Sequence, residues 1–124
     1  MTLLLDTHVM LWWRTNDKGL GPLVRDAIAS ADTVFVSAAS AWEVAIKIAA
    51  GRLTLPATFE SGVEASGFER LPITFTHAER AASLPLHHRD PFDRMLLAQA
   101  QVEGLTLVTR DSRLRAYDVA LMPA

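Results

Sequence analysis

The chain has 124 residues, half of them hydrophobic and about a fifth charged, which is typical of one ordered globular domain and leaves no room for a long disordered tail. The absence of cysteine excludes disulfides, thiolate metal sites and cysteine nucleophiles. The net charge of −2 argues against binding to nucleic acid by bulk electrostatics. Any such binding would depend on arginines near the binding site. No apolar run could span a bilayer and no leader pattern is present, so we expect a soluble, cytoplasmic protein with one domain over residues 1–124.

Apolar runs alternate with helical patterns along the chain. In order, the patterns predict a buried strand at 3–5, a helix at 22–29, a strand at 33–36, a helix at 38–50, a looser helix at 58–68, a weak strand at 70–73, helices at 76–83 and 91–102, and a strand at 105–109. Pro72 makes the weak strand an edge candidate, and Gly51 and Gly104 lie where helices end. This alternation predicts an α/β protein with a mainly parallel sheet covered on both faces by helices.

Two aspartates follow closely on predicted strands. Asp6 comes after the run 3–5, and Asp111 comes after the run 105–109. In open parallel sheets, ligands bind beyond the carboxyl ends of the strands, where loops and helix N-termini converge. We therefore expect both carboxylates at one edge of the sheet, either as ligands of a cation or simply as N-caps of helices that begin just after them.

Glu43 lies within a predicted helix that is almost entirely apolar as far as Lys47. Helical spacing places Ala39, Ile46 and Ala50 on its face, which predicts a carboxylate directed at apolar surroundings. A buried, unpaired carboxylate is expensive, so such a group acquires a cation or a proton. The alternative is an ion pair with Lys47 on an exposed face, worth about 0.3–0.5 kcal/mol.

Asp90 and Asp93 flank the start of the helix predicted at 91–102. Asp90 fits the N-cap, Pro91 the first helical position, and Asp93 the third, where an acid favours the helix dipole. The same spacing puts the two side chains on one side of the helix, about 5–6 Å apart at Cβ, so that both could reach one cation. Asp93 also shares a face with apolar residues of the helix, so it is aimed inward, whereas Asp90 lies at the edge and could be only a cap.

Carboxylates that converge at one sheet edge repel one another unless a multivalent cation or raised pKa values relieve them. Oxygen ligands without cysteine favour Mg²⁺ or Mn²⁺, and such a site hydrolyses phosphodiesters. Five arginines flank the acids and could contact backbone phosphates: Arg89, Arg94, Arg110, Arg113 and Arg115. His87 and His88 are predicted to be exposed loop residues, with a role as ligand or base as the less favoured alternative.

Four segments, taken in order, resemble those of the PIN-domain ribonucleases, and specifically the VapC-like toxins of type II toxin–antitoxin pairs. They are Leu3-Leu4-Leu5-Asp6-Thr7-His8, the stretch 37–47 with Trp42-Glu43-Val44, the block His88-Arg89-Asp90-Pro91-Phe92-Asp93-Arg94 running into Leu97-Ala98-Gln99-Ala100, and Val108-Thr109-Arg110-Asp111. Each segment alone is a weak signal, but the ordered set is highly specific and covers essentially the whole chain.

The resemblance implies a three-layer α/β/α PIN-like fold, endoribonuclease activity that depends on Mg²⁺ or Mn²⁺, a homodimer, and inhibition by a cognate VapB-like antitoxin. The acidic positions of the family fall on Asp6, Glu43, Asp93 and Asp111, and none is missing. On this interpretation Asp6 and Asp93 hold the ion most directly, Glu43 and Asp111 complete the site or orient water, and Asp90 is a further candidate ligand. The candidates on the substrate side are Arg89, Arg94, Arg110, Thr7 and Thr109; the two threonines match small polar positions that can bind the water shell of the metal or a ligand acid.

Two alternatives belong to other functional classes. A phospho-acceptor signalling domain has a similar length, the same alternation and an acidic pocket for Mg²⁺, but it needs an Asp after a middle strand and a Lys after a late one, where this chain has Ser37 and Arg110. A non-catalytic interaction module would use Trp12, Trp13 and Trp42 as anchors. Helical spacing cannot bury both Trp12 and Trp13 on one narrow face.

Overall fold

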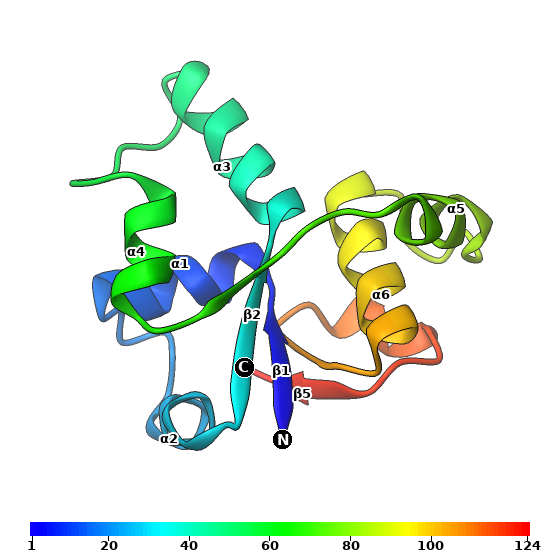
Figure 1. The fold of residues 1–124 in the computed structure, drawn as a ribbon, viewed down its shortest axis with the longest axis horizontal. Coiled ribbons are helices and arrows are strands. Elements are labelled where there is room, and N and C mark those ends of the chain that lie inside the picture. Colours follow the sequence, from blue (N-terminus) through cyan, green and yellow to red (C-terminus); the bar gives the residue numbers. More distant parts are fainter.

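A five-stranded sheet forms the centre of the molecule in the computed structural model, which describes residues 1–124 (Figure 1). The strands are β1 (Thr2–Leu5), β2 (Thr33–Ser37), β3 (Glu69–Leu71), β4 (Thr106–Thr109) and β5 (Leu121–Pro123). Their order in the sheet is β3-β2-β1-β4-β5, and every neighbouring pair is parallel. The helices are α1 (Thr7–Thr15), α2 (Pro22–Ser30), α3 (Ala38–Ala49), α4 (Phe59–Ala65), α5 (Phe75–Ser83) and α6 (Pro91–Glu103), with a 3₁₀ helix, η1, at Ser112–Ala116.

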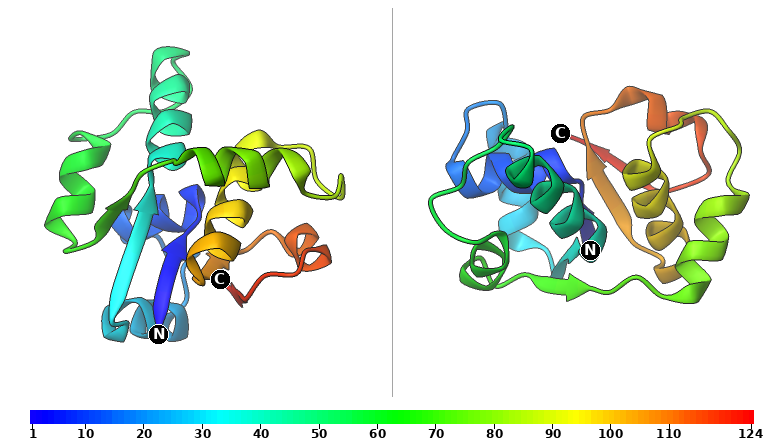
Figure 2. Two further views of the ribbon diagram at one scale, coloured as in Figure 1. Left: turned by 45° about the vertical axis from the view of Figure 1, so that its right-hand side comes forward. Right: turned by 90° about the horizontal axis from the view of Figure 1, so that it is seen from above.

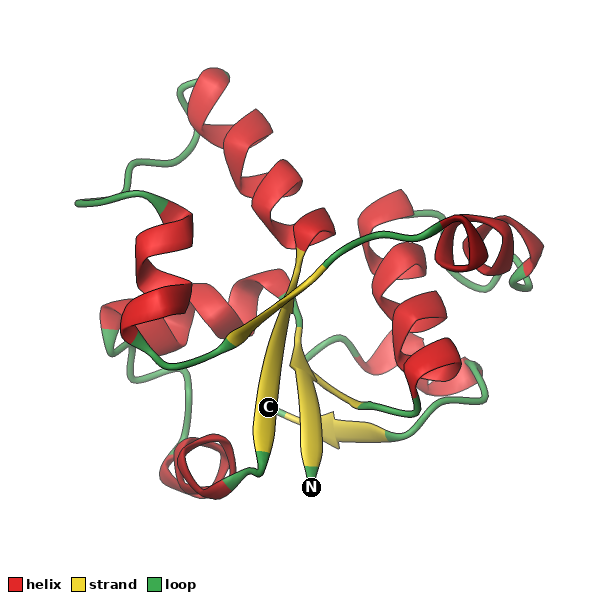
Figure 3. Cartoon of the chain, viewed as in Figure 1, coloured by secondary structure: helices red, strands yellow, loops and turns green.

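The helices form two layers on opposite sides of the sheet (Figures 2 and 3). One apolar cluster joins Leu3 and Leu5 of β1 to residues of α1 to α4, and a second joins Leu4 to residues of α6 and η1, with α5 packed against it. Successive side chains of a strand point to opposite faces, so β1 reads as a continuous apolar run because both of its faces are covered. The predicted three-layer arrangement is confirmed.

The register of the sheet decides which side chains meet at its carboxyl edge. Leu5 is the partner of Val36 in β2 and of Val108 in β4. The residues that come next, Asp6, Ser37 and Thr109, therefore lie beside one another where the three central strands end. This edge also receives the N-termini of α1 and α3, as Figure 1 shows.

The predicted strands and helices are all present, with shifts of a few residues at their ends. The weak strand ends at Leu71, before Pro72, and β3 is an edge strand as predicted. Three elements lie outside the predictions. They are β5, a three-residue edge strand, and α1 and η1, for which the sequence indicates only starts after Asp6 and Asp111. None of the helices has both the length and the hydropathy that a bilayer crossing requires.

Candidate active site

Asp6 is fixed between two elements at the carboxyl edge of the sheet. It is the N-cap of α1, where its Oδ1 accepts the Val9 N–H at 2.9 Å. Its Oδ2 accepts the Thr109 hydroxyl at 2.5 Å, across from the end of β4. The side chain is buried, and this burial raises its pKa, although the hydrogen bond from Thr109 partly offsets the rise. The fold therefore fixes the orientation of the Asp6 side chain, and its burial destabilises the charged carboxylate.

Asp93 lies in the first turn of α6 and is the most strongly perturbed acid in the chain. Its Oδ2 is 2.7 Å from Nε2 of His88. Burial, together with the negative charges of Asp90 and Asp6, raises its pKa to about 6, although the hydrogen bond from His88 opposes the rise. The predicted cap is confirmed beside it, since Asp90 Oδ1 accepts the N–H groups of Phe92 and Asp93 at 2.8 and 3.2 Å.

Asp111 caps η1 and is bound by an arginine. Its Oδ1 accepts the backbone N–H of Arg113 at 3.0 Å, and the Arg113 guanidinium donates to both oxygens at 3.0 and 2.8 Å. These contacts hold the pKa of Asp111 below its usual value. Its Oδ2 lies 3.7 Å from His88 Nε2, so the one imidazole stands between Asp93 and Asp111.

Glu43 is less enclosed than its sequence predicts. Its Oε2 lies 3.4 Å from Lys47 Nζ, and its side chain is 14% exposed. Ala39 is buried, but Ile46 and Ala50 are exposed, because α3 extends beyond the sheet. The expectation of wholly apolar surroundings is therefore wrong, and the ion pair is present. Glu43 still contributes to the acidic site, since its charge raises the pKa of Asp6.

The cluster has the chemistry of a divalent cation site. Ligand atoms of His88, Asp90 and Asp93 all lie within 4.8 Å of one another, and Asp6 is near enough to affect the pKa of Asp93. Burial disfavours the charged forms of both Asp6 and Asp93, and a nearby cation would relieve that cost. The donors are oxygen and imidazole nitrogen only, because the chain has no cysteine. The residues present therefore fit a divalent metal ion.

The sequence gives His88 only as a less favoured ligand or base, and the expectation that it is exposed is wrong. It is 8% exposed and points into the acidic cluster, whereas His87 is exposed as predicted and packs its ring edge-on against Tyr117 at 5.2 Å. Two sequence signals point to His88: it lies two residues before Asp90, and it opens the block that resembles the family, which does not include His87.

Arg94 does not lie where a phosphate could reach it. It is 8% exposed, and its guanidinium donates to four backbone carbonyls in and after α5: Ala81, Leu84, Pro85 and His88, at 2.8–3.3 Å. A cation there satisfies carbonyls that a helix C-terminus leaves unpaired. The predicted contact between Arg94 and RNA is therefore replaced by a role in holding the loop before α6.

The other residues predicted to contact substrate differ in their exposure and in the hydrogen bonds that they already make within the protein. Arg110 is exposed, but its guanidinium donates to the carbonyls of Gly19 and Ala124 and lies 4.3 Å from the centre of the Trp12 ring. Thr7 is buried and donates to Ser40 Oγ at 2.9 Å. Thr109 is buried and bonded to Asp6. Arg89, Arg113 and Arg115 are exposed. Arg89 is the predicted substrate contact whose side chain is exposed and makes no hydrogen bond or ion pair within the protein.

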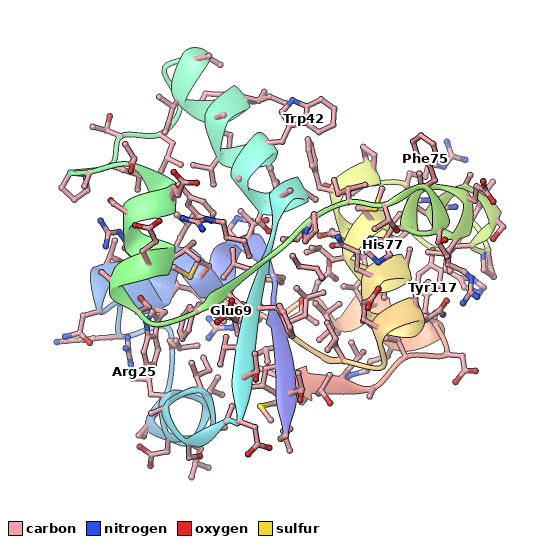
Figure 4. All side chains as sticks on the ribbon, in the orientation of Figure 1. Arg25, Trp42, Glu69, Phe75, His77 and Tyr117 are labelled. Carbon is pink, nitrogen blue, oxygen red and sulfur yellow. The ribbon has the colours of Figure 1, made fainter.

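The tryptophans are neither plain core nor a single docking face. Trp42 projects from α3 toward α6 (Figure 4), with its ring 5.4 Å from that of Phe92 and 63% of the residue exposed. Trp12 and Trp13 are both partly buried, on either side of α1: Trp12 lies under Arg110, and Trp13 packs on Phe68. The prediction that Trp12 and Trp13 cannot both be fully buried is confirmed.

The raised pKa of Asp93 gives a pH-dependent effect on stability in the metal-free protein. The folded chain holds this proton up to about pH 6, against 3.8 for the usual side chain, so stability from this group falls as pH rises from about 4 to about 6. Asp93→Asn cannot ionise, and we expect its unfolding free energy to exceed that of the unmodified chain by a margin that grows by on the order of 2 kcal/mol over this window. Urea unfolding at pH 4, 5, 6 and 7 after chelation measures the margin; a margin independent of pH would contradict the assignment.

Comparison of the sequence and the fold with known proteins shows the family of this chain. Residues 3–120 match the PIN domain. The chain is 35% identical over 119 residues to Ribonuclease VapC22 of Mycobacterium tuberculosis, covering 94% of this chain and 92% of that protein. Its fold is similar to that of VapBC2 from Rickettsia felis bound to a DNA fragment from their promoter, with a TM-score of 0.75 and 14% identity over 99% of this chain and 98% of that chain. It is also similar to that of DNA-bound VapBC from Salmonella typhimurium, with a TM-score of 0.73 and 18% identity over the same shares. The chain belongs to the PIN domain family.

Proposed function

We propose that this chain is a metal-dependent endoribonuclease that acts in the cytoplasm as the toxin of a type II toxin–antitoxin pair, with residues 1–124 working as one PIN domain. The observation that carries the proposal is the gathering of acids around the buried Asp6 and the partly buried Asp93 in a chain that aligns over 94% of its length with Ribonuclease VapC22. Membership of the PIN family removes the basis for the phospho-acceptor alternative. The acidic cluster, with its raised pKa values, argues against a purely non-catalytic module.

The acids divide the work at the carboxyl edge of the sheet. Asp6 and Asp93 hold the ion most directly, because Asp6 is buried, Asp93 is partly buried, and both are oriented by hydrogen bonds. Glu43 and Asp111 complete the site or orient water, and Asp90 adds a carboxylate while it caps α6. Oxygen-rich donors of this kind favour Mg²⁺ or Mn²⁺. When bound, such an ion supplies Lewis-acid chemistry that offsets charge developing on the phosphate during hydrolysis.

Exposed arginines near the acids are the candidates for holding RNA. Arg89 lies just before α6, and Arg113 and Arg115 lie on η1, all three with exposed side chains. Phosphate contacts from arginine give affinity without reading the base. Arg113 also donates to Asp111, so a phosphate that binds Arg113 would compete with Asp111 for the same guanidinium.

Two protein partners follow from the family resemblance. A VapB-like antitoxin inhibits the nuclease, in keeping with the VapBC complexes among the structures of similar fold. A second copy of the chain forms a homodimer, for which the exposed apolar residues Trp42, Ile46 and Ile48 of α3 offer a surface. We expect the reading frame immediately upstream to encode the antitoxin. Expression of this chain alone should arrest growth, and co-expression of the antitoxin should relieve the arrest.

Metal removal tests the proposed activity. We expect purified protein to cleave tRNA or mRNA in Mg²⁺ or Mn²⁺, to lose this activity in EDTA, and to regain it when excess ion is added. Asp93→Asn, purified in parallel, reports any contaminating nuclease and should be inactive. Asp26→Asn is the matched control, because Asp26 lies on α2 at the opposite end of the sheet (Figure 1). Cleavage that persists in EDTA or in Asp93→Asn would contradict the proposal.

A further inference from the structure

The loop between α5 and α6 directs one imidazole into the acidic cluster. His88 is buried, and its Nε2 lies 2.7 Å from Asp93 Oδ2 and 3.7 Å from Asp111 Oδ2. The four acidic positions that the family resemblance supplies do not include it. An aromatic nitrogen donor therefore stands among carboxylates in a place where a surface loop would normally present its side chain to water.

The backbone around His88 is held in place by hydrogen bonds with Tyr117 and Arg94. Its N–H donates to the Tyr117 hydroxyl at 2.9 Å, and that hydroxyl in turn donates to the Pro85 carbonyl at 2.6 Å. The His88 carbonyl accepts from Arg94 at 3.3 Å. Tyr117 lies beside α6 and is itself buried (Figure 4). These hydrogen bonds fix the loop so that the His88 ring points at the acids. Metal ligands are commonly oriented by hydrogen bonds of this kind.

The spacing of the donor atoms suits one small octahedral ion. Ligands at about 2.1 Å from such an ion lie about 3.0 Å apart when adjacent and about 4.2 Å apart when opposite. The 2.7 Å between His88 Nε2 and Asp93 Oδ2 is within a few tenths of the adjacent value. The ligand atoms of His88, Asp90 and Asp93 all fall within 4.8 Å of one another. An ion bound to both atoms would lie to the side of the line between them, so the hydrogen bond between His88 and Asp93 would be replaced by two bonds to the ion after a turn of the imidazole.

We propose that His88 is a nitrogen ligand of the divalent ion, and that it shifts the preference of the site from Mg²⁺ toward first-row transition ions such as Mn²⁺. The inference rests on the proposed function in that an ion is bound at this cluster. Mg²⁺ is held through oxygen and dehydrates reluctantly, whereas transition ions accept imidazole more readily. A chain with carboxylates alone at this edge would lack that preference.

A positioning role is the competing explanation for the same contact. A histidine that only donates to Asp93 would orient the carboxylate, and its loss would weaken the binding of Mg²⁺ and Mn²⁺ by the same factor. A histidine that binds the ion contributes a nitrogen to one ion more than to the other. The two roles therefore differ in metal selectivity and in the atoms directly bonded to the ion.

Pulsed electron paramagnetic resonance of the Mn²⁺-loaded protein separates the two roles, because it detects nitrogen bonded to the ion without any need for RNA cleavage. We expect ¹⁴N modulation in the unmodified chain that changes to the ¹⁵N pattern when the histidines are labelled with ¹⁵N. The modulation should vanish in His88→Asn and persist in His8→Asn and His87→Asn. His8 is included because it is exposed near Asp6 and affects its pKa, and His87 because it is the exposed neighbour in the loop.

Calorimetric titration of the same proteins with each ion supplies the second readout. His88→Asn should weaken Mn²⁺ binding about ten- to a hundredfold and Mg²⁺ binding by no more than about threefold. His87→Asn should change neither, and His8→Asn, which acts only through the charge of Asp6, should change both by the same factor. Equal losses for the two ions in His88→Asn, or bound Mn²⁺ without nitrogen modulation in the unmodified chain, would overturn the role of His88 and leave the nuclease assignment standing. Failure of Mn²⁺ to bind at all would overturn both this role and the metal dependence of the proposed function. Histidine ¹⁵N modulation that persists in His8→Asn and His87→Asn decides the matter even if His88→Asn fails to fold, because the fourth histidine, His77, is bonded to Glu103 at the other end of α6.

Discussion

Replacement of Asp6 by Asn is expected to lower the rate of RNA cleavage by about a thousandfold or more, while the unfolding free energy of the metal-free protein stays the same or rises. The amide oxygen can still accept the Val9 N–H that caps α1, so the local structure survives. The substitution removes the negative charge of the Asp6 carboxylate. Burial makes this charge costly in the metal-free protein, but a bound cation requires it. Function and stability should therefore move independently.

Cleavage rates and urea unfolding of the same preparations check this expectation. Asp6→Ala is the informative companion, because it removes both the charge and the cap and should cost about 1 kcal/mol of stability in addition to the activity. Asp26→Asn, an exposed acid on α2, should change neither quantity. If Asp6→Asn kept more than a tenth of the activity, Asp6 would not be a principal ligand of the ion.

Replacement of Arg94 by Met should produce the largest loss of stability, about 3–5 kcal/mol of unfolding free energy. Met fills a similar volume but donates nothing, so four carbonyls at and after the end of α5 lose their donor in a buried place. The loop that carries His88 and leads to Asp90 should then open more often. Faster hydrogen exchange over residues 84–90 and a lower urea midpoint are the measurements.

A matched pair of variants separates burial from charge at this position. Arg89→Met removes an exposed arginine from the same loop and should change stability by less than about 0.5 kcal/mol. Arg94→Lys keeps the charge but not the planar fork, so it should recover only part of the loss. A change of under about 1 kcal/mol in Arg94→Met would show that the carbonyls find water instead.

Much of the fold follows from local patterns. The continuous apolar runs at β1, β2 and β4 indicate strands that are covered on both faces, and parallel strands bring the residues that follow them to one edge. The positions of Asp6 and Thr109 depend only on that rule. The cap formed by Asp90 is equally local, because it needs no more than the order of acid, proline and acid.

The errors arise where tertiary contacts decide the outcome. In sequence, His88 looks like an exposed loop residue and Arg94 like an exposed residue at the start of a helix. Both are buried because the end of α5 and the distant Tyr117 pack against the loop before α6. Glu43 looks buried because its helix is apolar, yet α3 extends past the sheet and leaves Ile46 and Ile48 nearly half exposed. Sequence periodicity gives the face of a helix but not how far the helix extends beyond its support.

The hydrogen bond between Asp6 and Thr109 joins residues that are 103 positions apart, and this separation has a consequence during translation. The ribosome makes Asp6 103 residues before Thr109, so neither Thr109 nor β4 exists while the intervening chain is being synthesised. Because β1 lies between β2 and β4, it can pair with β2 early but has both of its neighbours only after β4 has been made. A chain that ends before Thr109 therefore lacks Asp111 and the hydrogen bond that orients Asp6, so its remaining acids are not arranged as a site.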